Sequence, residues 1–294
     1  MANFSQIGDF QQIPLTIRQH PYLMDHRFED NAVFPAVEAM QILAASAKTC
    51  FPEINTELIL NADFDKFLIL QKDQKTIEGF NELSRKQDGF IESKLVTRMK
   101  SRKLAILRQK EHVSICFPSG TTPEAEFPSF EELISLEGKT FSVSSRAVYR
   151  ELVPFGPSYH NVTGDLLISE NGVIANLSAP ISEASTDPLG SPFPLDAAFH
   201  AACVWCQCFL KFIGFPVGFE KRTIFRRTLP GNGYIARITP VKTSPELLVC
   251  DLWICDPKGS FFENIAGLKM RDVSAGRRKP PEWITNMQSL GSEK

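Results

Sequence analysis

Two stretches of the chain place apolar residues in patterns that predict helices. Residues 35–48, PAVEAMQILAASAK, repeat apolar side chains at the three-and-four spacing of one helix face. These positions are Val37, Met40, Leu43, Ala44 and Ala47. Proline is favourable at such a helix start, and the small residues suit a helix enclosed by a curved surface. Residues 194–212, PLDAAFHAACVWCQCFLKF, are apolar almost throughout and predict a second, buried helix behind Pro194.

Strand-like runs bounded by turn signals surround both predicted helices. The expected strands cover residues 58–70, 89–101, 104–117, 162–169, 173–180, 234–241, 247–255 and 260–272. A charged turn at 100–103 joins two of them, and Asn171-Gly172 marks a tight hairpin in the second half. Each half is therefore one helix with antiparallel strands. Because neither a Rossmann glycine pattern nor alternating βαβ units occurs in the sequence, we expect an α+β protein with two related halves.

The best linker candidate lies between Pro118 and Pro128, where the sequence reads PSGTTPEAEFP. We therefore expect an N-terminal unit at residues 1–120, a linker at 121–139, a C-terminal unit at 140–276 and a tail at 277–294.

Composition narrows the class of protein. The 294 residues are 43% hydrophobic and 22% charged, which is typical of a folded protein with a sizeable core. The net charge of −2 gives no general attraction to nucleic acid or to an anionic membrane, and no apolar run is long enough to suggest a membrane span. The N-terminus lacks the features of a secretory signal, and the seven cysteines lie mostly in apolar runs. Reduced thiols in a cytoplasmic protein fit this pattern.

Candidate chemistry centres on His26 and Asp196. His26 lies nine residues before Pro35, whereas Asp196 opens the second helix and shares a face with His200, four residues later. One ionisable group from each half could meet at a pseudo-twofold interface. The plainer readings are a surface or capping histidine at 26, a helix cap at Asp196 and a core histidine at 200.

The other polar or sulfur-containing candidates are read as structural. His112 and His160 fall on or beside strand-like runs. The sequence CVWCQC contains Cys203, Cys206 and Cys208, but no second Cys/His pair of metal-binding spacing accompanies it, so we expect no metal site. Buried small apolar side chains are the better reading of these cysteines.

Four segments, in order, resemble motifs of the dehydratase domains of polyketide and fatty acid synthases. Residues 22–40, YLMDHRFEDNAVFPAVEAM, resemble the first signature, in which a histidine is followed by a glycine four residues on and a proline nine residues on. The second segment, PFGPSYHNV (154–162), resembles the motif Tyr-Gly-Pro-x-Phe. The third, FPLDAAFHAAC (193–203), resembles Asp-x-x-x-Gln/His. The fourth, FPVGFEKRTIF (215–225), resembles Leu-Pro-Phe/Val-x-Trp. Residues 247–273 are similar to the last strands of the family, so the resemblance covers nearly the whole chain.

The resemblance implies a double hotdog, in which two antiparallel sheets are each wrapped round a long central helix, with hotdogs at 1–120 and 140–276. It implies a dehydratase that removes water from a 3-hydroxyacyl thioester and yields the 2-enoyl thioester. The substrate would be carried on the phosphopantetheine of an acyl carrier protein, with no further cofactor. The implied partners are that carrier and other synthase components, and a homodimer is compatible with the family.

The resemblance also assigns roles to residues. His26 would take the C2 proton, Asp196 would assist departure of the 3-hydroxyl, and His200 would orient Asp196. The residues expected to contact substrate are Pro35, Phe155, Gly156, Pro157 and Tyr159. Neutral imidazole suits the base near pH 7, because its unperturbed pKa is about 6.5.

Two further groups matter for this chemistry. An apolar tunnel would raise the pKa of Asp196, so that the protonated acid could donate a proton. The N-terminus of the helix favours the ionised carboxylate instead, and in that form Asp196 would position the hydroxyl or a water. A backbone N–H at the start of the Pro35 helix is the expected donor to the thioester oxygen.

The chain departs from the family pattern at three positions. Asp30 replaces the glycine of the first signature, Phe155 replaces the tyrosine of Tyr-Gly-Pro, and Phe219 replaces a tryptophan. Tyr159, four residues after Phe155, is a candidate to supply the missing hydroxyl. The alternative functions are enoyl-thioester isomerisation, which needs the same two groups, and a non-catalytic acyl-chain binding module, which the changes at 30 and 155 favour. A hotdog thioesterase fits the order of the motifs less well.

Overall fold

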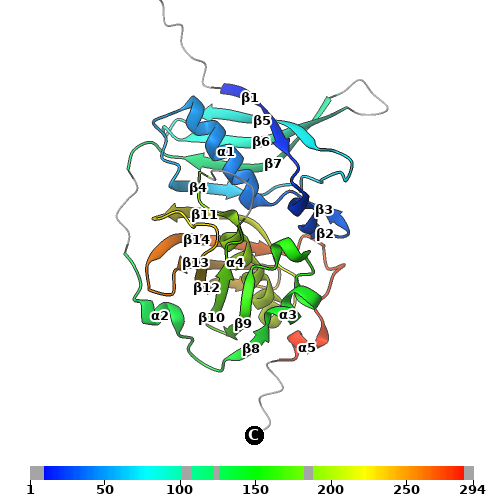
Figure 1. Ribbon diagram of the computed structural model, residues 1–294, viewed down its shortest axis with the longest axis vertical. Helices are drawn as coiled ribbons and strands as arrows, with labels where there is room; N and C mark the ends of the chain where they lie inside the picture. The colour runs from blue at the N-terminus through cyan, green and yellow to red at the C-terminus, as the bar shows by residue number, and fades with distance from the viewer. Residues whose placement is uncertain (1–9, 101–106, 122–125, 182–187, 288–294) are drawn as a thin grey trace, which may run out of the picture.

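Each half of the molecule wraps an antiparallel sheet around one long helix (Figure 1). The computed structural model describes residues 10–100, 107–121, 126–181 and 188–287. The expected α+β double hotdog is confirmed. The two expected sheets join edge to edge, so that the described strands form one continuous sheet of 12 strands, beside a two-stranded hairpin.

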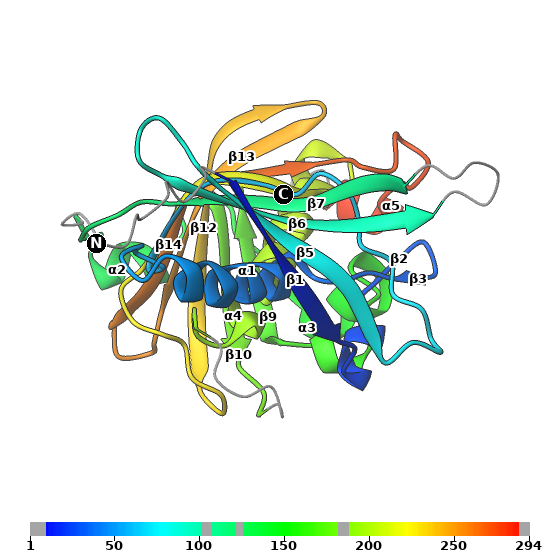
Figure 2. The same ribbon diagram turned by 90° about the horizontal axis from the view of Figure 1, so that it is seen from above.

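The N-terminal sheet curves around helix α1 (Ala36–Cys50), which lies across its inner face (Figure 2). Its strands run in the order β1-β5-β6-β7-β4. They are β1 (Phe10–Arg18), β4 (Leu58–Asp63), β5 (Thr76–Arg85), β6 (Ile91–Lys100) and β7 (Leu107–Phe117). Met40, Leu43, Ala44 and Ala47 of α1 are fully buried, which follows from the apolar spacing in the sequence.

The C-terminal sheet encloses helix α4 (Pro192–Trp205), which continues as a π-helical turn, η4 (Cys206–Leu210). Its strands run in the order β11-β14-β13-β12-β10-β9-β8. They are β8 (Phe141–Ser144), β9 (Val162–Ser169), β10 (Gly172–Ser178), β11 (Phe215–Ile224), β12 (Gly233–Ser244), β13 (Leu247–Cys255) and β14 (Phe261–Arg271). Every residue of α4 is buried. Contrary to the expectation from the sequence, one segment, Pro192–Leu210, has the length and apolar character of a membrane span. Its most apolar stretch is 89% buried inside the protein, as expected of a core helix.

Strands β4 and β11 form the seam between the halves. They pair antiparallel, with Ala62 opposite Phe219, and α1 contacts α4 on the inner side. Beside the seam, Arg222 on β11 donates from Nε to Oε2 of Glu263 on β14 at 2.7 Å, and both residues are 1% exposed. The two helices therefore meet where the halves join, which brings their N-terminal residues toward one region.

Short elements complete the fold. They are η1 (Pro21–Asp25), β2 (Arg27–Phe28), β3 (Asn31–Ala32), α2 (Phe130–Ile134), α3 (Ser145–Ala147), η2 (Val148–Leu152), η3 (Pro157–Tyr159) and α5 (Glu282–Thr285). Helix α2 lies within the segment predicted as a linker and begins with a capping box between Ser129 and Glu132. Phe127, just before it, packs against Phe225, Trp253 and Phe261 on the outside of the C-terminal sheet.

Most predicted elements are confirmed, including both long helices and the hairpin at Asn171-Gly172. The strand predicted over residues 58–70 is wrong in its second half, because β4 ends at Asp63 and residues 64–70 leave the sheet to form a cavity wall. Strands β1, β5, β8 and β11 and the short strands β2 and β3 were not predicted. The residues of the predicted turn after Lys100, positions 101–103, lie outside the described residues, as do parts of the predicted linker (122–125) and tail (288–294).

Candidate active site

A tight hairpin carries His26. The chain leaves η1 at His26, forms β2, turns at Glu29 and Asp30, and returns through β3 to Val33. Both turn residues have positive φ, 45° and 65°, as a two-residue hairpin turn of this hand requires. Asp30 thus adopts the left-handed conformation that the family's glycine would adopt at little cost. The substitution therefore preserves the turn at the cost of some backbone strain.

The backbone of the hairpin fixes the His26 ring. Val33 donates its N–H to the His26 carbonyl at 2.9 Å, and His26 Nδ1 lies 3.0 Å from the Val33 carbonyl oxygen. Because a carbonyl only accepts, Nδ1 carries the proton and donates it to Val33. Nε2 is then unprotonated in the neutral ring and available as a base.

Helix α4 supplies Asp196 and His200 from adjacent turns of one face. His200 Nε2 lies 3.0 Å from Asp196 Oδ2, within ion-pair distance. Neither atom has a hydrogen-bond partner of good geometry among the described residues, so we treat the contact as primarily electrostatic. Both side chains are about 95% buried, with 5% and 6% of their surface exposed. At that depth the charge on Asp196 depends on its histidine neighbours.

Asp196 also faces His26 across the junction of the two halves. Its Oδ1 lies 3.7 Å from His26 Nε2. Both atoms are acceptors when His26 is neutral, so they do not hydrogen-bond to each other directly. A hydroxyl group or a water between them could contact both.

Burial and neighbouring charge set the protonation states. Burial lowers the pKa of His26 below the ordinary 6.5, and the nearby Asp196 charge opposes that shift without cancelling it. Burial would raise the pKa of Asp196, but His200 and His26 together hold it below its usual value. Of the two outcomes left open for Asp196 by the sequence, the structure therefore favours the ionised carboxylate.

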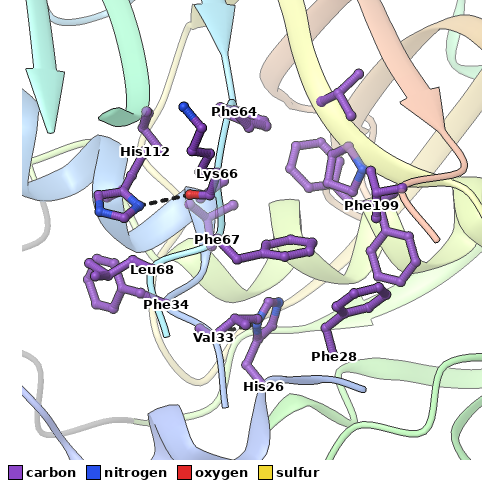
Figure 3. Close-up of a pocket in the computed structure, with 18 of the residues that line it drawn as sticks. His26, Phe28, Val33, Phe34, Phe64, Lys66, Phe67, Leu68, His112 and Phe199 are labelled. Atoms are coloured by element: carbon purple, nitrogen blue, oxygen red, sulfur yellow. Dashed lines mark hydrogen bonds between the residues drawn. The ribbon is translucent and has the colours of Figure 1, made fainter. Parts of the chain in front are cut away.

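These three residues open onto a cavity of about 450 Å³ with mainly apolar walls, shown in Figure 3. Its walls come from the His26 hairpin, the start of α1, the 64–69 segment, β7, α4 and the start of β11. Labelled wall residues include Phe28, Phe34, Phe64, Phe67, Leu68 and Phe199. Arg27 and Lys66, both exposed, also line it. A pocket of this size and character suits a small or medium-length acyl group.

The five residues expected to contact substrate take different positions. Phe155 lines the cavity, and its ring centroid is 4.4 Å from that of His26 and 4.9 Å from that of His200. Pro35, Gly156, Pro157 and Tyr159 are not among the described residues that line it. Pro35 precedes α1, where Ala36 and Val37 form part of the wall instead. Substrate contact by these four residues stays a prediction.

Gly156-Pro157-Ser158 holds Asp25, the residue before His26. Gly156 donates its N–H to the Asp25 carbonyl at 2.8 Å, while the Ser158 N–H and hydroxyl donate to Asp25 Oδ2 at 3.0 and 2.6 Å. A Cβ on Gly156 would lie 2.3 Å from the Asp25 side chain, so only glycine fits this approach. The Tyr-Gly-Pro-like segment of the second half therefore positions the His26 hairpin of the first.

One tyrosine hydroxyl that contacts His200 comes from a residue that the sequence did not single out. Tyr149 places its oxygen 3.4 Å from His200 Nδ1. Tyr159 contacts the edge of His26 at 5.1 Å between centroids, but its buried hydroxyl has no hydrogen-bond partner within the described part of the chain. Tyr149 lies six residues before Phe155 in a run, AVYREL, whose helical character alone gave no signal of function.

The remaining histidines and cysteines sit in structural roles. His112 contributes to the cavity wall, yet both its nitrogens are engaged, with Lys66 O at 2.9 Å and Thr97 Oγ1 at 2.8 Å (Figure 3). The prediction that Cys203, Cys206 and Cys208 are buried is confirmed. Cys203 also lines the cavity, and burial raises the pKa of its thiol to about 12, which leaves it unreactive.

Comparison with known proteins places this geometry in a family context. Residues 136–280 match the family described as polyketide synthase dehydratase N-terminal domain. That match covers the C-terminal half of this chain, including Asp196 and His200, and leaves His26 outside it. A search of curated proteins found no match.

Solved structures with this fold include several dehydratase domains. A trans-AT polyketide synthase dehydratase domain from Brevibacillus brevis is 19% identical, with a TM-score of 0.70 over 92% of this chain and 96% of that chain. The dehydratase domain of the CurF module of curacin polyketide synthase is 16% identical, with a TM-score of 0.70 over 92% and 96%. A dehydratase domain of a mycocerosic acid synthase-like polyketide synthase is 15% identical, with a TM-score of 0.69 over 90% and 93%. At these identities the likeness establishes the fold.

Proposed function

Because residues 136–280 belong to the polyketide synthase dehydratase family and the whole chain has the fold of such domains, we propose that this protein dehydrates 3-hydroxyacyl thioesters in polyketide biosynthesis. The observation that carries the proposal is the pairing of His26 Nε2 with Asp196 Oδ1 across an apolar cavity, 3.7 Å apart. One base and one group that handles the leaving hydroxyl must flank two adjacent carbons of the substrate, and these two side chains meet that need.

The protonation states support a route in which His26 moves the proton. Its unprotonated Nε2 takes a proton from C2, and the electron pair of that C–H bond moves toward the thioester carbonyl. The ionised Asp196 accepts a hydrogen bond from the 3-hydroxyl and holds it beside His26. The C3–O bond then breaks as the His26 imidazolium returns its proton to the departing oxygen. The products are the 2-enoyl thioester and one water, and both side chains regain their starting states.

The thioester oxygen gains negative charge during C2 proton removal and needs a donor. The first N–H groups of α1 are the candidates, because Pro35 provides no side-chain cap and Ala36 and Val37 line the cavity. The positive end of the helix dipole adds to the attraction for an oxyanion.

The expected substrate carrier is the phosphopantetheine arm of an acyl carrier protein, which acts with other synthase components in the cytoplasm. Two observations support this part of the proposal. The cavity walls are apolar enough for an acyl tail, and the exposed Arg27 and Lys66 at the cavity would attract the phosphate of such an arm. The chemistry requires no further cofactor.

The test is to incubate the protein with a 3-hydroxyacyl carrier-protein thioester and follow the loss of one water by mass spectrometry. We expect dehydration by the wild type and by the His20→Ala variant, whose ring lies outside the cavity, and little turnover by His26→Ala. Conversion of a 2-enoyl thioester to its 3-enoyl isomer, without dehydration, would replace the proposal with an isomerase. Binding of the acyl carrier without any conversion would indicate a non-catalytic module.

A further inference from the structure

His200 is held from both sides, by Asp196 at Nε2 and by Tyr149 at Nδ1. We propose that Tyr149 is a positioning residue, which donates its hydroxyl proton to Nδ1 of His200 and so directs the Nε2–H of that ring toward Asp196. This inference rests on the proposed function for its catalytic consequence. The geometry itself, with contacts of 3.0 Å to Asp196 Oδ2 and 3.4 Å to the Tyr149 oxygen, concerns the resting protein.

The proton on His200 is placed by the carboxylate. Asp196 is ionised, so both its oxygens only accept. An unprotonated Nε2 at 3.0 Å from Oδ2 would set two electron-rich atoms against each other in a buried site. Nε2 therefore carries a proton, and we infer that Nδ1 is the nitrogen that accepts from a donor.

The Tyr149 hydroxyl is oriented to be that donor. Its oxygen accepts a hydrogen bond from the Val162 N–H at 2.7 Å, which turns the hydroxyl hydrogen away from the strand. Burial raises the pKa of Tyr149, so the hydroxyl keeps its proton. The contact to Nδ1 is long, at 3.4 Å, and serves to select a tautomer more than to bind tightly.

The Tyr149 ring is itself fixed in place. It stacks on His160, with centroids 4.2 Å apart and planes 14° apart, and meets His200 edge to face at 5.8 Å. His160 Nε2 in turn lies 2.9 Å from the carbonyl oxygen of Phe155, whose ring packs against both active-site imidazoles. The Tyr149 hydroxyl thus contacts His200 at Nδ1, whereas the phenylalanine ring at position 155 carries no hydroxyl.

The first measurement is the tautomer of His200 in the wild type at neutral pH. Nitrogen-15 NMR of labelled histidines distinguishes Nδ1 from Nε2 protonation, and the His200→Gln variant identifies the signal. We expect His200 to be protonated at Nε2 and not at Nδ1. A ring protonated at Nδ1, or at both nitrogens, would overturn the inference without any reference to turnover.

The second measurement compares Tyr149→Phe with Tyr234→Phe. Tyr234 is a matched control, because its buried hydroxyl also accepts from a backbone N–H, that of Leu229 at 2.7 Å, but lies away from the cavity. We expect Tyr149→Phe to mix the two His200 tautomers and to lower kcat about tenfold, the order of one lost hydrogen bond, with KM nearly unchanged. Tyr234→Phe should preserve both the tautomer and kcat.

The two measurements separate failure of this inference from failure of the proposed function. If the wild type dehydrates its substrate and Tyr149→Phe keeps both the His200 tautomer and kcat, the inference is wrong and the function stands. If the wild type lacks dehydratase activity, the NMR signature still decides the role of Tyr149. Should Tyr149→Phe fail to fold, a wild-type His200 protonated at Nδ1 would still overturn the inference.

Discussion

His26 Nε2 and Asp196 Oδ1 lie 3.7 Å apart, although one comes from a hairpin of the N-terminal half and the other from the core helix of the C-terminal half. Each is bound on its other side by its own half, His26 by the Val33 carbonyl and Asp196 by His200. The site is therefore shared by the two halves, and its geometry depends on the seam between them.

Removing the charge of Asp196 should abolish most turnover. Asp196→Asn keeps the shape of the side chain but replaces the carboxylate that orients the 3-hydroxyl beside His26. We expect kcat/KM to fall on the order of 10²- to 10⁴-fold, measured by formation of the 2-enoyl thioester. Asp165→Asn, an exposed strand residue bonded to Ser142, is the control and should retain activity. Near-normal turnover by Asp196→Asn would remove this residue from the mechanism.

The dependence of kcat/KM on pH should report the protonation of His26. The neutral ring is the active base. Burial lowers its pKa below 6.5, even though the negative charge of Asp196 acts to raise that pKa. Activity is lost only when the pH falls through that lowered pKa. We therefore expect kcat/KM to be flat from about pH 8 down to 6.5 and to decline only at lower pH. An acid limb centred above 6.5 would contradict this assignment.

A methyl group at Gly156 should displace His26 indirectly. The backbone φ of −76° suits alanine, so the effect comes from the added Cβ, which would lie 2.3 Å from the Asp25 side chain. We expect Gly156→Ala to destabilise the protein by about 1–3 kcal/mol and to lower kcat by about tenfold or more. Thermal unfolding and steady-state kinetics would measure both effects.

Gly233→Ala is the control for that substitution, because its Cβ would meet no atom closer than 3.7 Å. A change below about 0.5 kcal/mol is expected there. Equal effects at the two glycines would mean that the approach of Gly156 to Asp25 has no special role.

The hairpin turn should improve when glycine is restored at position 30. Asp30 holds a φ of 65°, which glycine adopts without the steric cost of a Cβ. We expect Asp30→Gly to stabilise the protein by about 0.5–1 kcal/mol and to preserve activity, since the turn already has the required shape. Loss of stability in this variant would show that the Asp30 side chain contributes more than its backbone strain costs.

The buried ion pair beside the seam should be costly to break. Arg222→Met would leave the Glu263 carboxylate, 1% exposed, without its partner at 2.7 Å. We expect a loss of about 3–5 kcal/mol in the free energy of unfolding, measured by chemical denaturation. Arg85→Met removes an exposed pair with Glu53 at 3.0 Å and should cost less than about 1 kcal/mol. Similar costs for the two variants would contradict a structural role for the buried pair.

Local patterns in the sequence predicted much of the fold. They failed for segments whose side chains deviate from simple strand alternation because of their place in the tertiary structure. Strand β5 was missed because two of its three buried positions are Gly79 and Asn81, which break the apolar alternation; Asn81, fully buried, accepts a hydrogen bond from the Ser93 hydroxyl on β6 at 2.8 Å. Residues 64–70, FDKFLIL, look like a strand because five of the seven are apolar. Their apolar side chains serve the cavity wall and not the sheet.

The sequence by itself determined the two core helices, the Asn171-Gly172 hairpin and an α+β protein with two related halves, because helical spacing and turn residues are local properties of the chain. The double hotdog and the roles of His26, Asp196 and His200 were expected from the resemblance of four short motifs to a known family. Only the tertiary structure decided that the two sheets join through β4 and β11, that Gly156 holds Asp25, and that Tyr149 reaches His200. The tertiary structure also favours the ionised form of Asp196, because it holds the pKa of that carboxyl below its usual value. Burial alone would raise this pKa, and the opposing effects of His200 and His26 depend on the tertiary contacts that bring the two halves together.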